Sequence, residues 1–84
     1  MQDAVATDKG LSASAMQVLM VIENSPAVDG WHEMSHTEIV GKTGRHRTTI
    51  GRALLLLQEH GYLVKSPPEK RGWHRKIRYQ VVVQ

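Results

Sequence analysis

The sequence predicts one small α+β domain, mainly helical, with a β-hairpin in its C-terminal part. Two patterns lead to this fold class. Before residue 61, apolar residues recur at three- and four-residue intervals in two segments, which is the spacing of helices with one buried face, and a capping box between them marks a third helix. From residue 62 onward, β-branched and aromatic residues alternate with polar ones on both sides of a loop rich in proline and charge, as in two paired strands. The length of 84 residues suits a single core.

The first helix is expected to begin after Ser12, whose hydroxyl can cap it. Its buried face follows the helical spacing, and the Asn24–Pro26 segment ends it. Residues 1–10 hold few large apolar groups, so we expect a flexible N-terminal tail there and a folded domain over residues 11–84. The predicted buried positions of this helix are Ala15, Val18, Leu19 and Ile22.

A connector is expected over Val28–Met34, with Asp29-Gly30 as its turn and part of it as a short strand. Trp31 and Met34 are the apolar side chains that can anchor this connector in the core.

The second helix is predicted from a capping box. Ser35 is followed three residues later by Glu38, so the serine oxygen can accept from the backbone NH of Glu38 while the glutamate reaches back. The helix should reach Lys42 or Thr43 and end at Gly44.

The third helix is predicted from His46 to His60, with Gly61 ending it. Leu55 and Leu56 exceed what one buried stripe requires, so they are expected to face the first helix, the tail or a second subunit. Two strands, Tyr62–Lys65 and Trp73–Val83, complete the hairpin. The core positions of this helix are Ile50, Ala53, Leu54 and Leu57.

Charge is distributed unevenly along the chain. Residues 1–40 contain one Lys or Arg and six Asp or Glu, a net charge of −5, whereas residues 41–84 contain ten and two, a net charge of +8. A basic half of this kind indicates a surface that faces a polyanion, although a solvated basic face is the alternative.

Three other chemistries are disfavoured by the residues present. Gly41-Lys42-Thr43 resembles the end of a phosphate-binding loop, but His36 stands where that motif needs its first glycine. His32 and His36 have the spacing of helical metal ligands, yet the helix start at Ser35 separates them, and no third ligand is evident. No nucleophile, base and acid form a recognisable set. We therefore expect neither an enzyme nor a cofactor or metal site.

The stretch "MSHTEIVGKTGRHRTTIGRALLLLQEHGYLVK" resembles the helix-turn-helix core of winged-helix DNA-binding domains, including MarR-like and GntR-like transcription regulators. "TEIVGKTG" is similar to the family's second helix and turn, and "RTTIGRALLLLQEHGYL" to its recognition helix and following strand. A wing ending in "RKIRYQV" completes the likeness, which covers nearly all of residues 11–83. The resemblance implies three helices plus a two- or three-stranded antiparallel wing.

The same resemblance implies sequence-specific binding of double-stranded DNA, with helix 46–60 in the major groove and the 65–78 wing on the backbone or in the minor groove. The helix start would supply base and phosphate contacts, and the wing tip would supply further phosphate contacts. The expected DNA-binding residues are Ser35, His36, Thr37, Arg45, His46, Arg47, Thr48, Thr49, Arg52, Lys70, Arg71, Arg75 and Lys76.

A small repressor-like transcription regulator is the function that best fits this resemblance. The alternatives are a winged-helix module that binds proteins, or the DNA-binding domain of a replication, plasmid or phage factor. Partners would be double-stranded DNA and, in one version, a second copy of the chain. The leucine run Leu54–Leu57 is far shorter than the roughly 20 apolar residues of a membrane span. Together with the lack of cysteine, this favours a cytoplasmic, nucleoid-associated protein without membrane contact.

Overall fold

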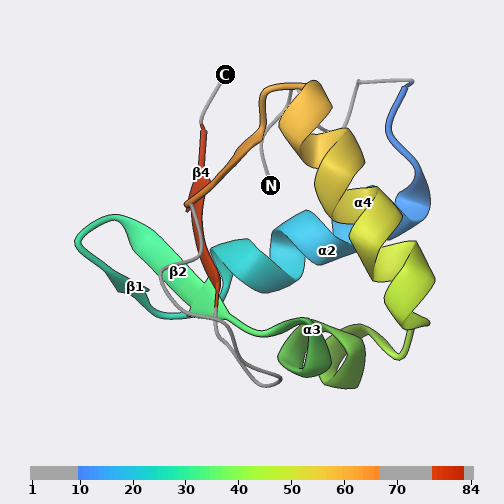
Figure 1. Cartoon of the computed structure of the whole chain (residues 1–84), viewed down its shortest axis with the longest axis horizontal. Coiled ribbons are helices and arrows are strands. Elements are labelled where there is room, and N and C mark those ends of the chain that lie inside the picture. Colours follow the sequence, from blue (N-terminus) through green and yellow to red (C-terminus); the bar gives the residue numbers. More distant parts are fainter. Residues whose placement is uncertain (1–9, 67–76, 83–84) are drawn as a thin grey trace.

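The computed structural model of the chain describes residues 10–66 and 77–82. In these ranges it is a small α+β domain with three helices and a four-stranded antiparallel sheet (Figure 1). Residues 1–9, which make up most of the expected tail, lie outside the described residues. The tip of the expected hairpin and the first residues of its second strand, over 67–76, also lie outside them. The elements are α2 (Ala13–Glu23), β1 (Ala27–Val28), β2 (Trp31–Met34), α3 (His36–Thr43), α4 (Arg47–Glu59), β3 (Leu63–Lys65) and β4 (Ile77–Val81).

The helices begin and end where their capping residues predict. The Ser12 hydroxyl accepts from the backbone NH of Ala15 at 3.1 Å, which confirms the predicted start of α2. At the end of α4, the NH groups of Gly61 and Tyr62 return to the carbonyls of Gln58 and Leu57. Gly61 adopts a φ of +80°, and these two bonds form a Schellman motif that only a left-handed residue permits. Local sequence signals were therefore sufficient to place the helices.

The segment expected to be mostly a connector is instead a β-hairpin. Strands β1 and β2 pair across a two-residue turn, in which Asp29 and Gly30 have φ values of +54° and +82°. Positive φ at both positions is the geometry that an Asp-Gly turn favours. Asp29-Gly30 was thus correctly placed as the turn, and the strand content was underestimated.

Strand β2 also joins the C-terminal strand, so the sheet is larger than the expected two or three strands. Its order is β1-β2-β4-β3, and Glu33 of β2 lies opposite Arg78 of β4. These two side chains form an ion pair of 3.6 Å between Arg78 Nε and a Glu33 carboxylate oxygen. The predicted strand number was wrong because the β2–β4 pairing joins segments that are far apart in the sequence.

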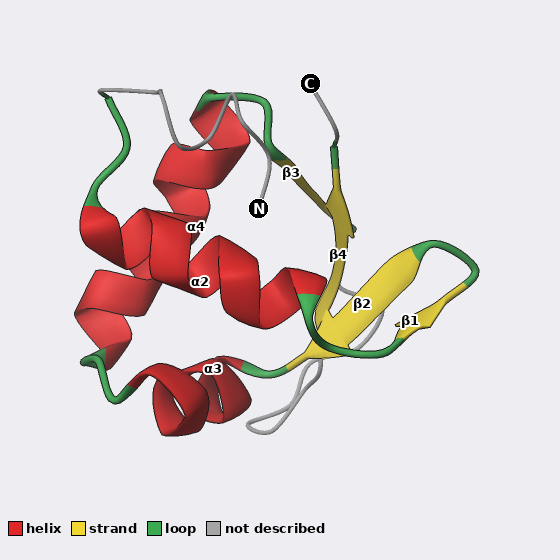
Figure 2. Cartoon of the chain, turned by 180° about the vertical axis from the view of Figure 1, so that it is seen from behind, coloured by secondary structure: helices red, strands yellow, loops and turns green. Residues whose placement is uncertain are grey.

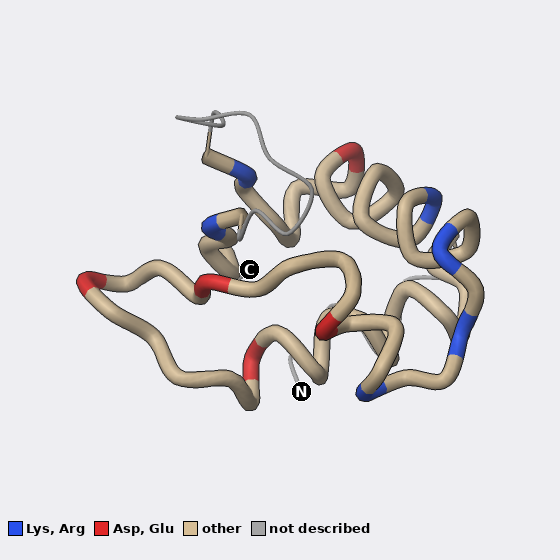
Figure 3. The backbone as a smooth tube through the Cα atoms, turned by 60° about the horizontal axis from the view of Figure 1, so that its bottom comes forward, with Lys and Arg blue, Asp and Glu red and all other residues tan. Residues whose placement is uncertain are grey.

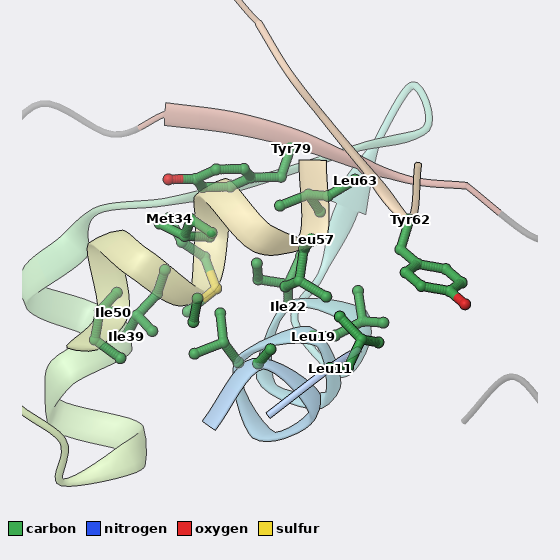
Figure 4. Packing of buried hydrophobic residues seen from close by; sticks show 14 residues of the cluster. Leu11, Leu19, Ile22, Met34, Ile39, Ile50, Leu57, Tyr62, Leu63 and Tyr79 are labelled. Atoms are coloured by element: carbon green, nitrogen blue, oxygen red, sulfur yellow. The ribbon is translucent and has the colours of Figure 1, made fainter. Parts of the chain in front are cut away.

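The core lies between the helices and one face of the sheet. Figure 4 shows Met34 of β2 and Tyr79 of β4 pointing toward the apolar side chains of the helices. Tyr79, Met34 and all of the predicted core residues of α2 and α4 are buried, whereas Trp31 is only half-buried. Met34 is therefore the stronger of the two predicted anchors.

Helix α2 runs through the middle of the helical layer, where it packs on α3, α4 and the sheet (Figure 2). One face of α3 and one face of α4 pack against α2. The opposite faces of these two helices, and the turn between them, remain at the surface. Among the described residues, no helix is long and apolar enough to cross a bilayer.

Candidate nucleic-acid interface

The turn between α3 and α4 is fixed by its own backbone and by one threonine. Gly44 has a φ of +71°, and its NH donates to the Val40 carbonyl at 2.8 Å, so the chain leaves α3 in a left-handed step that glycine takes without steric cost. The Thr43 hydroxyl donates to the Ile39 carbonyl at 2.8 Å and accepts from the Arg45 NH at 3.2 Å. The start of α4 is thereby held in a defined direction relative to α3.

Gln17 of α2 connects this turn to the core helix. Its side-chain oxygen accepts from Arg45 Nε at 2.5 Å, and its amide nitrogen donates to the Thr43 carbonyl at 3.5 Å. These bonds span 28 and 26 residues of sequence. Sequence reasoning missed Gln17 because a polar residue on a helix carries no sign of a distant partner. Arg45 therefore has a positioning contact in addition to its expected role toward DNA.

His46 caps α4. Its Nδ1 accepts from the Thr48 backbone NH at 3.2 Å, and its backbone is extended, with φ −65° and ψ 149°. The imidazole thus takes the role that a serine or aspartate oxygen usually has at a helix start. Because Nδ1 is the acceptor, this nitrogen carries no proton while the cap is in place.

The outward side of α4 changes character along its length. Arg47, Thr48 and Arg52 are exposed near its start, opposite the buried stripe that holds the helix on the core. Leu55 follows in the middle with 57% of its surface exposed, and Glu59, in the last turn, is also exposed. A carboxylate there would repel phosphate, so an anionic partner would be confined to about the first two turns.

Leu55 and Leu56 differ in the structure. Leu56 is half-buried and packs against the core, whereas Leu55 is exposed. The expected surplus of leucine on α4 is thus reduced to one residue.

An open hollow lies beside the start of α4. It is lined by His36 from α3 together with His46, Arg47 and Thr48. Burial lowers the pKa of His36 below its usual 6.5, and the charges of Lys65 and Arg47 lower it further. The Nε2 atom of His36 is buried, with no hydrogen-bond partner among the described residues. Three elements, α3, α4 and β3, therefore bring positive or potentially positive groups together here.

The predicted site residues fall into four groups. Exposed are Arg47, Thr48, Arg52, His46 and Thr37, and half-buried are Arg45, Thr49 and His36. Ser35 is buried, and its hydroxyl accepts from the Glu38 NH at 3.1 Å as the cap of α3. The predicted contacts at the wing tip lie outside the described residues; they are Lys70, Arg71, Arg75 and Lys76.

Basic and acidic residues gather in different parts of the described chain. Figure 3 shows Lys and Arg positions following one another through the turn before α4 and along its first half. Asp and Glu positions lie on the β1–β2 hairpin, in the last turns of α2 and α4, and, as Glu38, in the first turn of α3. The turn before α4 and the first half of α4 therefore carry basic residues and no acidic one.

The two other ligand motifs in the sequence have local structural roles. Gly41, Lys42 and Thr43 form the last turn of α3 and do not form a loop that opens a helix. His32 lies in β2, where its Nδ1 is 2.9 Å from the Ser25 carbonyl oxygen. Over residues 10–66 and 77–82, no group of three or more His, Asp or Glu side chains is arranged to hold a metal ion.

Comparisons with known protein families, with curated proteins and with solved structures found no match to this chain. The function must therefore be argued from the residues and their geometry.

Proposed function

We propose that the chain is a winged helix-turn-helix protein that binds double-stranded DNA in a sequence-specific way and acts as a small, repressor-like transcription regulator. Helix α4 would enter the major groove with its first two turns, and the hairpin of β3 and β4 would lie on the backbone or in the minor groove. The main support is the division of α4 into a buried apolar stripe and an exposed Arg-Thr-Arg start.

The order of the elements also supports this proposal. Helices α3 and α4 are joined by a three-residue turn with a left-handed glycine, and α2 packs behind both of them. Such a pair can lay its second helix in the major groove while the first crosses the backbone. The fixed turn matters here because base contacts require the helix to hold one direction relative to the phosphates.

The exposed side chains at the start of α4 suit two kinds of contact. An arginine can donate two hydrogen bonds to guanine O6 and N7, and a threonine can bond a base edge or contact a thymine methyl group. Arg47 and Arg52 are therefore assigned to base reading or phosphate contact, and Thr48 to base reading. His46 and Arg45, beside the turn, are assigned to phosphates.

Charge substitution in α4 tests the proposal. Arg47→Ala and Arg52→Ala should each weaken binding to a duplex selected from a random pool, by about 1–3 kcal/mol where the arginine contacts a base. Lys42→Ala is the matched control, because it removes the same charge from the last turn of α3. Binding is measured by fluorescence anisotropy, and thermal unfolding checks the fold. Unchanged affinity in both arginine variants would rule out this use of α4.

Leu55 favours one rival function, a module that docks on another protein. Leu55 is an apolar side chain with 57% of its surface exposed, which contact with a partner would remove from water. In that case Leu55→Ser should abolish a protein complex and leave duplex binding unchanged. Under the DNA proposal, Leu55 could instead join two copies of the chain. The mass of the complex with the selected duplex would then show two copies for the wild type and one for Leu55→Ser.

A further inference from the structure

The hollow beside α4 is lined by basic and hydrogen-bonding side chains that come from two helices. Arg47 and Thr48 line it from α4, His46 from the cap of that helix, and His36 from the start of α3. Lys65 of β3 is close enough to His36 to lower its pKa. The hollow therefore collects cations and donors from the starts of α3 and α4, and the charge of Lys65 acts on His36 from β3.

We propose that this hollow binds a single phosphate group, and that His36 takes up a proton when it is filled. The inference rests on the proposed function for its natural source, a phosphate of the DNA backbone. A free tetrahedral dianion would offer the hollow the same negative charge and hydrogen-bond acceptors as a backbone phosphate.

The geometry favours an anion over any other small ligand. Arg47 offers several NH donors, Thr48 a hydroxyl, and the His36 imidazole a further donor when it is protonated. His46 accepts from the Thr48 NH through Nδ1, so its Nε2–H is its available donor. Both helices start at this place, and the NH groups of their first turns carry partial positive charge. Lys65 and Arg47 also place positive charge near His36, which a dianion would neutralise.

His36 is the group whose proton would respond. In the free protein its ring favours the neutral form because it is partly buried and faces two cations, Lys65 and Arg47. His46 shares the hollow, and Glu38 is the acidic residue in the first turn of its own helix. A phosphate in the hollow would stabilise the imidazolium and raise the pKa of His36, so binding would consume a proton. Affinity would then rise as the pH falls.

The decisive measurement is the titration of His36 in the full chain, followed by NMR of its imidazole between pH 5 and 8. It is made on the free protein, with saturating duplex, and with sodium sulfate, whose charge is constant over this range. A raised pKa with both ligands identifies a general anion site, and a raised pKa with duplex alone identifies a backbone-phosphate site. An unchanged titration with both overturns the proposal.

Two variants link the proton to affinity. Duplex affinity of the wild type should rise on going from pH 8 to 6, by up to about tenfold for each unit of pKa change. His36→Gln should lose this dependence. His46→Asn should keep it, because asparagine replaces the cap without titrating. Loss of the dependence in His46→Asn and not in His36→Gln would overturn the assignment. A wild type that binds sulfate in the hollow but no duplex would contradict the proposed function and leave the anion site standing.

Discussion

At the scale of single residues, Tyr79 places a polar hydroxyl group inside the hydrophobic core. Its ring is fully buried and its hydroxyl has no hydrogen-bond partner among the described residues. Burial raises its pKa to about 12. A neutral hydroxyl without a partner is a local cost to the fold, and an ionised one would be a larger cost.

Replacing Tyr79 with phenylalanine should therefore leave stability unchanged or raise it by about 1 kcal/mol at pH 7. The pH dependence has a definite sign. The unfolded tyrosine ionises near pH 10 and the folded one near pH 12, so wild-type stability is lost as the pH rises through this window, by roughly 2–3 kcal/mol. Urea unfolding at pH 8, 10 and 11 should show a smaller alkaline loss in Tyr79→Phe. Equal losses in both proteins would contradict the assignment.

At the scale of elements, the glycines within α3 and α4 differ from the glycine that ends α3 in their backbone conformation. A Cβ atom at Gly51 would meet nothing within 4 Å, and the same holds for Gly41. Neither glycine is therefore needed for close packing against a neighbouring element. Gly44 also has open space, but its φ of +71° strains any other residue.

These three glycines give a matched series of alanine variants. Gly51→Ala and Gly41→Ala should each stabilise the protein by up to about 1 kcal/mol, because alanine is the better helix former. Gly44→Ala should destabilise it by about 1–2 kcal/mol. If the outer face of α4 approaches DNA, only Gly51→Ala of the two stabilised variants should weaken duplex binding. Thermal unfolding and anisotropy measure both effects, and unchanged binding in Gly51→Ala would place that residue away from the contact.

Gln17 provides the second prediction at this scale, since it joins α2 to the turn. Gln17→Ala should lower stability by about 1–2 kcal/mol through its two lost hydrogen bonds, and should weaken duplex binding by freeing Arg45. A double-mutant cycle tests whether Gln17 affects duplex binding through Arg45. In an Arg45→Ala background, Gln17→Ala should cost little further affinity, whereas additive losses would mean that the two residues act separately. Gln17→Glu should keep the Arg45 contact and retain most of the binding.

At the scale of the whole molecule, the separation of charge predicts a strong effect of salt. Contacts with about four to six phosphates per subunit should make the logarithm of affinity fall with the logarithm of salt concentration at a slope of roughly −3.6 to −5.4. Arg47→Ala should make this slope shallower by about one unit if it contacts a phosphate, and change it less if it reads a base. A slope near zero for the wild type would exclude a backbone interface.

Features that depend on short sequence separations were the ones predicted well. The caps at Ser12 and Ser35, the turn at Gly44 and the buried stripe of α4 each follow from residues within a few positions of one another. The pairing of β2 with β4, the bond from Gln17 to Arg45 and the hollow shared by His36 and Arg47 do not. Each depends on how separate elements pack, and a short polar or mixed segment carries little information about that.

The sheet order also bears on how the chain folds. Strand β4 lies between β2 and β3 and is the last described element, so β2 has only the two residues of β1 to pair with until residues 77–81 are available. The helices can form from local contacts in the meantime, whereas closing the sheet requires a loop of more than 40 residues. We therefore expect the stable domain to form only once residues 77–81 can pair with β2 and β3.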